Sequence, residues 1–170
     1  GVVYRSLGDY NNALLYANRA LSLDIELGNK DWETADLSNV ALLYQDLGYL
    51  DKALEYYKKS LVISNEEGKA AEYNNIGLIY YYKNEYDQAI DYFKKAIAID
   101  QRFGNYDGLA RDFLNLGDTY RKIKNYSEAE YYLKQGLLME EKLGNKDWQG
   151  AAYLYFGKLY RDKGNKALAR

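Results

Sequence analysis

The apolar and small residues of the chain recur at intervals of three and four, which is the spacing of one face of an α-helix. The pattern is clear at Leu37, Val40, Ala41 and Tyr44, and again at Phe113, Leu116, Gly117 and Tyr120. A second kind of stretch has the same period, at Ala53, Leu54, Tyr57, Ser60 and Leu61, and at Ala89, Ile90, Phe93, Ala96 and Ile97. We therefore predict an all-α chain built from two alternating kinds of helix.

A short turn separates the two kinds of helix, and it occurs five times. Its copies are LGDYNNA (7–13), LGYLDKA (47–53), KNEYDQA (83–89), IKNYSEA (123–129) and KGNKALA (163–169). The closing alanines are 40, 36, 40 and 40 residues apart, and a tyrosine stands nine residues before each, at Tyr4, Tyr44, Tyr80, Tyr120 and Tyr160. Five copies in register predict antiparallel helix pairs stacked in series, which is an α-solenoid.

A second connection joins one predicted helix pair to the next. Its copies are LGNKDWE (27–33), FGNYDGL (103–109) and LGNKDWQ (143–149). Each is typical of a glycine that ends one helix, followed by an aspartate that caps the next. The third repeat is four residues shorter than the others, so we expect one helix to lose about a turn without rotation of its buried face.

Together these residues resemble the tetratricopeptide repeat family, whose consensus places an aromatic residue, Leu-Gly, tyrosine, and then alanine, an aromatic residue and alanine at these offsets. The repeat of 40 residues exceeds the usual length of about 34, and the proline that usually ends the second helix is missing. Both departures resemble spindle-orientation adaptors, kinesin light chains and microbial signalling proteins. The resemblance implies one right-handed α-solenoid over residues 1–170, with repeats 29–67, 68–104 and 105–144 and partial repeats 1–28 and 145–170.

The repeat pattern is cut at both ends of the chain, and neither end carries the polar capping unit that solenoids normally have. We expect a fragment of a longer array, with uncapped terminal helices that associate end to end. The first residues, GVVYRSLGDY, lack the basic start and apolar core of a signal peptide. The cytoplasm is the favoured compartment, although the sequence does not decide it.

Composition and charge narrow the chemistry that the chain can perform. Its 170 residues include no cysteine, histidine or proline, and the formal net charge is −2. There is no phosphate-binding loop, metal cluster or nucleophile–base pair, so we expect no catalytic residue, no metal site and no cofactor. The charge argues against nucleic-acid binding. No apolar run approaches the length of a membrane span, so no membrane association is predicted.

Three asparagines, Asn39, Asn75 and Asn115, lie two residues before the small residue of each first helix. Asparagine is less favourable than alanine in a helix by roughly 0.5 kcal/mol, so three in register require a reason. The family resemblance implies that first helices line a concave groove and that these amides hold the backbone of an extended peptide. The other interpretation is that they cap or bridge neighbouring helices. The fourth equivalent position, Tyr155, departs from the pattern.

Most of the 21 tyrosines follow the repeat and are expected to pack between helices. Tyr81 and Tyr82 do not, and we predict that they face the groove together with Arg111, Arg121 and Lys158. The groove positions carry six basic and three acidic residues, which favours an acidic, extended segment with apolar anchors.

The leading hypothesis is a protein–protein interaction scaffold that binds an extended peptide or partner segment in its groove. The family's clamp for chaperone tails is not expected, because Asn75 and Arg111 match two of its members while Ser38, Leu42 and Asn115 replace others. The alternative is a regulatory or self-assembling sensor module of a larger signalling protein. In that case the protein's other segments cover the groove, or the ends stack into oligomers.

Overall fold

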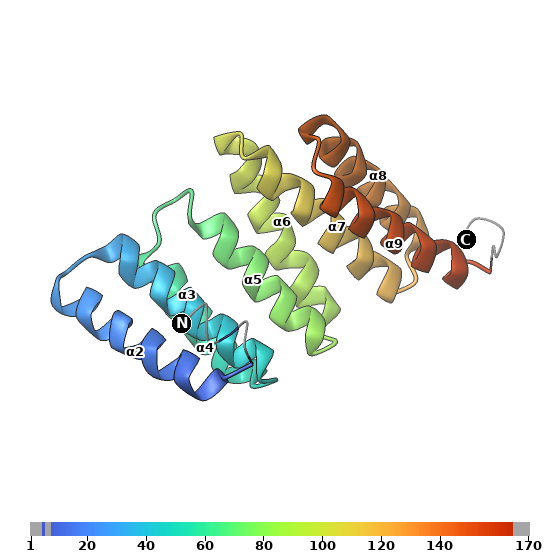
Figure 1. Cartoon of the computed structure of the whole chain (residues 1–170). Helices are drawn as coiled ribbons and strands as arrows, with labels where there is room; N and C mark the ends of the chain where they lie inside the picture. The colour runs from blue at the N-terminus through green and yellow to red at the C-terminus, as the bar shows by residue number, and fades with distance from the viewer. Residues whose placement is uncertain (1–4, 6–7, 165–170) are drawn as a thin grey trace.

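The computed structural model describes residue 5 and residues 8–164. Within these residues it contains eight complete helices, which follow one another across the molecule in chain order (Figure 1). Their bounds are α2 (Tyr10–Glu26), α3 (Lys30–Asp46), α4 (Leu50–Ile63), α5 (Lys69–Tyr82), α6 (Tyr86–Phe103), α7 (Tyr106–Lys122), α8 (Tyr126–Leu143) and α9 (Lys146–Asp162). No strand occurs between residues 8 and 164, which confirms the predicted all-α class.

Each helix packs against the next, and the most extensive contacts lie within the pairs α3–α4, α5–α6 and α7–α8. Contacts also connect α5 with α7 and α7 with α9. The first helices of successive pairs therefore touch one another along one side of the stack. This arrangement confirms the predicted solenoid of helix pairs and places α3, α5, α7 and α9 on its inner face. Tyr4 and Ala169 lie outside the described residues, and the division into numbered repeats stays a prediction.

The connections between pairs end their helices with glycine, as predicted, but asparagine caps the next helix. Gly28, Gly104 and Gly144 have φ of 68°, 71° and 72°, the left-handed conformation that glycine adopts without strain. The residue after each glycine caps the next helix, at Asn29, Asn105 and Asn145. Its side chain accepts a hydrogen bond from the backbone N–H group three residues further along the chain. The aspartates expected as caps instead lie in the first turn, at Asp31, Asp107 and Asp147, where their charge favours the helix dipole.

The short repeat shortens two helices rather than one. Helices α4 and α5 have 14 residues each, whereas the other helices have 17 or 18. A connection over residues 64–68 replaces the glycine turn, and Ser64 is extended with ψ of 142°. Figure 1 shows it as the long green loop between α4 and α5. The buried face is retained, because Ala53, Tyr57 and Ile76 remain buried.

The repeated tyrosines stack between helices, as the pattern predicted. A tyrosine of each first helix stacks on one of the following helix in the pairs Tyr44–Tyr56, Tyr80–Tyr92 and Tyr120–Tyr132, whose ring centroids are 5.5, 5.4 and 5.5 Å apart. Such aromatic pairs contribute about 0.5–1.5 kcal/mol beyond their buried area. These tyrosines are therefore part of the packing; Tyr81 and Tyr155 also pack in part against the core, whereas Tyr82 is exposed.

Glycines in the first helices allow the paired helices to approach closely. A Cβ atom on Gly77 would lie 2.7 Å from the ring of Phe93 on α6, and one on Gly117 would lie 2.8 Å from Leu133 Cγ on α8. The same atom on Gly117 would be 3.0 Å from the backbone nitrogen of Leu133, which cannot move without moving α8. Close packing at Gly117 thus depends on the missing side chain.

Substituting Gly117 and Gly150 by alanine should therefore have opposite effects. We expect Gly117→Ala to lower the free energy of unfolding by about 1–2 kcal/mol, because overpacking outweighs the gain of about 1 kcal/mol in helix propensity. A Cβ atom on Gly150 of α9 would lie in open space, with no neighbouring helix within 4 Å. Gly150→Ala should therefore raise the free energy of unfolding by roughly 0.5–1 kcal/mol. Urea unfolding followed by circular dichroism measures both. Stabilisation by Gly117→Ala would contradict the close approach.

Candidate functional site

The inner helices carry all the residues that the sequence predicted for partner binding. They are Asn39 on α3, Asn75, Tyr81 and Tyr82 on α5, Arg111, Asn115 and Arg121 on α7, and Lys158 on α9. Asn39 and Tyr82 are exposed, Arg121 is buried, and the others are partly buried. The structure thus brings these residues onto one side of the stack, but it gives them different surroundings.

Each of the three asparagines lines a different cavity. Asn39 borders one of about 110 Å³ with Asp36 and Leu42, next to α2. Asn75 borders one of about 80 Å³ between α5 and α7. Asn115 borders one of about 40 Å³ with Tyr82. The repeated amides therefore border three separate recesses, one beside α2 and α3 and two between α5 and α7.

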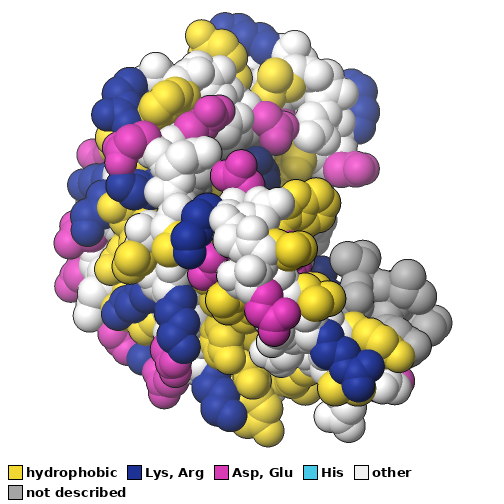
Figure 2. Space-filling view, turned by 90° about the vertical axis from the view of Figure 1, so that its left-hand side faces the viewer, with side chains coloured by type: hydrophobic (Ala, Val, Ile, Leu, Met, Phe, Trp, Pro, Cys, Tyr) yellow, Lys and Arg dark blue, Asp and Glu magenta, His cyan; other side chains and the backbone are white. Residues whose placement is uncertain are grey.

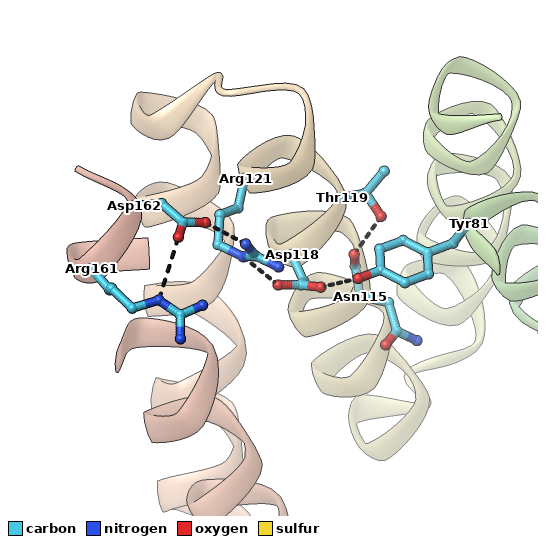
Figure 3. A network of polar contacts seen from close by, with 7 residues as sticks. All are labelled: Tyr81, Asn115, Asp118, Thr119, Arg121, Arg161 and Asp162. Carbon is cyan, nitrogen blue, oxygen red and sulfur yellow. Dashed lines mark hydrogen bonds and ion pairs between the residues drawn. The ribbon is translucent and has the colours of Figure 1, made fainter. Parts of the chain in front are cut away.

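An acidic residue precedes each asparagine by one helical turn. The three are Asp36, Glu72 and Asp112, in the segments DLSN, EYNN and DFLN. Asn39 and Asn75 lie near the acids of their own helices, Asp36 and Glu72, and each lowers the pKa of that acid. Among the described residues, the Asn115 carboxamide has no such partner, and Figure 3 draws no bond to it. The sequence contains this register of acids, but the predictions made from the repeat pattern did not include it.

The acids also join neighbouring helices. The hydroxyl of Ser38 on α3 donates to Glu72 Oε1 on α5 at 2.6 Å. The amide of Asn74 on α5 donates to Asp112 Oδ1 on α7. Ser38 and Asn74 occupy the same repeat position, so one donor-to-acid contact recurs between successive inner helices. Asn74, the neighbour of Asn75, thus bridges two inner helices.

Burial changes the ionisation of these acids. Desolvation raises the pKa of Asp36 and of Glu72 above their ordinary values. It raises the pKa of Asp112 to about 8, with a further contribution from the charge of Asp100. The second oxygens of all three carboxyls are buried and accept no hydrogen bond from the described residues. The inner face therefore carries a row of poorly compensated carboxyl groups.

An aromatic recess lies further along the inner face, near the C-terminal ends of α5 and α7. Leu78, Tyr81, Tyr82, Phe93, Asn115, Asp118 and Tyr155 line it. Tyr82 is 51% exposed, so its ring is open to a partner. The three tyrosines outside the packing pattern therefore meet at this one place. An apolar side chain flanked by an amide and by tyrosine edges would be bound well there.

A polar network connects three inner helices behind this recess (Figure 3). The Tyr81 hydroxyl of α5 donates to Asp118 Oδ2 of α7 at 2.5 Å. Arg121 donates to Asp118 Oδ1 at 2.6 Å and to Asp162 Oδ2 of α9 at 2.5 Å. Burial opposes the charge of Arg121, but its bonds to Asp118 and then Asp162 outweigh this and raise its pKa. The network fixes the Tyr81 ring relative to α7 and α9.

Arg121 therefore differs from the expectation that it is an open groove cation. Its side chain is only 8% exposed, and both sides of its guanidinium are occupied by carboxylates. Arg111 pairs with Asp107 at 3.2 Å, and the Lys158 ammonium lies 5.2 Å from the ring centroid of Tyr155. Arg111 and Arg121 are thus paired with carboxylates, whereas Lys158 lies against an aromatic ring.

Among the described residues, no three acidic, histidine or cysteine side chains are grouped as a metal ion would require. None of the helices between residues 8 and 164 combines the length and hydrophobicity needed to span a membrane.

Comparison with known families agrees with the repeat geometry. A family model described as a tetratricopeptide repeat matches residues 1–66 and 68–139. The chain belongs to the tetratricopeptide repeat family. No curated protein sequence matches it significantly. Tetratricopeptide repeats are protein-interaction modules, so membership of this family indicates that the chain interacts with other proteins.

Solved structures share the same architecture. BtubC (BKLC) from P. vanneervenii is 26% identical with a TM-score of 0.84, over 98% of this chain and 71% of that protein. MamA is 23% identical with a TM-score of 0.67, over 98% of this chain and 85% of that one. RapI is 24% identical with a TM-score of 0.84, and the match covers 97% of this chain but 48% of RapI. The last two likenesses concern the fold alone.

Proposed function

We propose that this tetratricopeptide repeat chain is an interaction scaffold that binds an extended segment of a partner protein along its inner face. The observation that carries the proposal is the placement of Asn39, Asn75 and Asn115, each in its own recess at successive positions along the stack. A carboxamide offers both a donor and an acceptor, as a peptide group does. Each contact contributes about 1 kcal/mol, so a row of amides supports binding without selecting side chains.

The aromatic recess supplies the second element of the proposal. Tyr82, Tyr155 and Leu78 would surround one apolar side chain of the bound segment. The network behind Tyr81 holds this wall in place, so the recess needs little ordering when the partner arrives. Two of the cations behind the expected acidic partner, Arg111 and Arg121, are paired with Asp107, Asp118 and Asp162. These two residues therefore attract an acidic segment less strongly than their charge in the sequence suggests.

Peptide-display selection on the chain tests this function. We expect peptides with one apolar anchor to enrich on the parent and to be lost on the Asn75→Ala/Asn115→Ala variant, because two backbone contacts disappear. The matched control is Asn11→Ala, an exposed asparagine on α2 outside the inner face, which should select the same peptides. Circular dichroism must show that all three proteins are folded. Equal selection by parent and double variant would contradict the groove function.

The alternative of self-assembly has one observation in its favour. The first and last complete helices of the described part of the chain expose large apolar side chains, such as Leu23 and Ile25 on α2 and Tyr153 and Leu154 on α9. Figure 2 shows the face at the α2 end, where hydrophobic side chains lie among alternating basic and acidic ones. Sedimentation of the same preparations over a range of concentrations separates the two functions. Constant mass supports the scaffold, whereas mass that rises with concentration supports stacking of the ends.

A further inference from the structure

A small polar cavity lies on the inner face between the N-terminal parts of α5 and α7. Its volume is about 80 Å³, and its wall includes Asn74, Asn75, Asp100, Asn105 and Asp112. Asp100 comes from the end of α6 and Asp112 from α7, and these residues are only 3% and 2% exposed. Two carboxyl groups from different helices therefore border one enclosed space.

The hydrogen bonds around the cavity leave acceptors without donors. Asn74 donates to Oδ1 of Asp112, and Asn105 donates to Oδ1 of Asp100 at 3.0 Å. Oδ2 of Asp112 is buried and accepts no hydrogen bond from the described residues. Because buried polar atoms are nearly always paired, this oxygen indicates a donor that comes from outside the chain.

Gly108 allows this arrangement. A Cβ atom on Gly108 would lie 2.1 Å from Asp100 Oδ2 and 2.5 Å from Asn105 Nδ2. The other two copies of this connection have tryptophan at the same position, Trp32 and Trp148. Glycine at this position therefore leaves room for the Asp100 carboxyl in this copy of the connection.

Electrostatics at the cavity favour a cation. Burial, and then the charge of Asp100, raise the pKa of Asp112 to about 8. Burial likewise raises the pKa of Asp100. Arg111, which also lines the cavity, opposes these shifts, and its guanidinium contacts the backbone carbonyl and the carboxylate of Asp107, both at 3.2 Å. A positive group between the two carboxyls would relieve their repulsion.

We propose that this cavity binds a primary ammonium group, the side chain of a lysine in the segment that the inner face binds. This rests on the proposed function and names one residue of its partner. An ammonium has three donors, and the residues that line the cavity include the carboxyls of Asp112 and Asp100 and the carboxamide of Asn75. The partly buried Asn75 lies beside the exposed Ala71 at the mouth, so a side chain can enter from the groove.

A divalent cation fits this wall poorly. Calcium takes six to eight oxygen ligands, but Asn74 and Asn105 present their N–H₂ groups to the carboxyls. The Oδ1 atom of Asn105 already accepts the backbone N–H of Gly108 at 3.2 Å. Too few oxygens remain for a metal ion, whereas three donors of one ammonium match those that are free.

The test uses n-butylammonium chloride as a probe for the lysine side chain, with nitrogen-edited NMR of the whole chain. We expect saturable shifts of the Gly108 backbone amide and of the Asn74 and Asn105 side-chain amides. Asp112→Asn should weaken binding at least about tenfold, because a charge-assisted hydrogen bond is lost. The matched control Asp91→Asn, an exposed acid on α6, should bind like the parent. Tetramethylammonium chloride, which has no N–H donor, should cause no saturable shift.

Several outcomes would overturn the proposal. Equal affinity of parent and Asp112→Asn would place the probe elsewhere, and saturation by calcium chloride alone would assign the cavity to a metal. If the probe bound to Arg111→Ala but not to the parent, the Arg111 guanidinium itself would be the cation that occupies the cavity. The titration needs no peptide, so it decides the cavity even where peptide selection fails. Conversely, selected peptides without lysine would support the groove and refute the lysine anchor.

Discussion

Replacing Arg121 by alanine is expected to lower the free energy of unfolding by about 3 kcal/mol, because it leaves buried carboxylates without their partner. Arg121 is 8% exposed and joins Asp118 of its own helix to Asp162 of α9. Its removal leaves Asp118, which is itself buried, with only the Tyr81 hydroxyl as a donor. Urea unfolding followed by circular dichroism at neutral pH measures the change.

Two other basic residues of the inner face are controls for Arg121. Arg111→Ala and Lys158→Ala should each change stability by less than about 1 kcal/mol, because their charges are partly exposed and screened by solvent. Arg121→Lys should recover only part of the loss, since lysine lacks the planar fork that holds two carboxylates. If Arg121→Ala were as mild as Lys158→Ala, the network would contribute little, and Arg121 would remain a candidate for direct partner binding.

Replacing Asp112 by asparagine is expected to stabilise the chain at pH 8 by about 2 kcal/mol. The folded protein raises the pKa of Asp112 from 3.8 to about 8, so the folded state holds this proton more tightly than the unfolded state does. The parent therefore loses stability as pH rises from about 4 to about 8, and the loss is complete above that range. The full linkage over four pKa units is roughly 5–6 kcal/mol, and relaxation around the charge reduces it.

Unfolding at a series of pH values tests the sign of this effect. Below pH 4 the parent and Asp112→Asn should differ little, and the gap should open steadily from about pH 4 to about pH 8. Asp100 has a raised pKa from burial as well and shares this window, so the variant should retain part of the slope. Phosphate buffer is required, because amine buffers supply the cation that the cavity is proposed to bind.

Glu130→Gln provides a comparison of opposite sign. Lys134 and Lys163 lower the pKa of Glu130 to about 2, so its charge stabilises the fold at pH values above its ordinary pKa. The substitution should cost less than about 1 kcal/mol at neutral pH, because the ion pairs are largely exposed. A pH-independent effect of Asp112→Asn would show that this carboxyl is not buried as described.

The helix pairs, the tyrosine stacking and the close approach at Gly77 and Gly117 could be predicted from sequence because they follow local periodicity and a repeated register. The N-cap was misassigned, because asparagine and aspartate both accept the same backbone hydrogen bond and both occur in each connection. Only the structure shows that the residue directly after the glycine is the cap.

The placement of Arg121 could not be read from its own repeat, because its second partner lies 41 residues away on another helix. The same separation joins Arg5 to Asp46 at 2.5 Å. In both pairs, the arginine directly follows the repeated tyrosine of one repeat. The aspartate lies two residues after the repeated tyrosine of the following repeat. A comparison of repeats with each other, rather than of residues within one helix, would have found this pairing and the acids Asp36, Glu72 and Asp112.

The shortened pair has a mechanical consequence. In a stacked array each unit is held only by its neighbours, so stability is the sum of unit and interface contributions. Among the described helices, the junction of α4 with α5 has the sparsest contacts between consecutive helices. Under load or thermal fluctuation, α2–α4 and α5–α9 therefore behave as two blocks, and the array yields first where they meet. A ligand that contacts residues on both blocks would hold them together and make the whole solenoid more rigid.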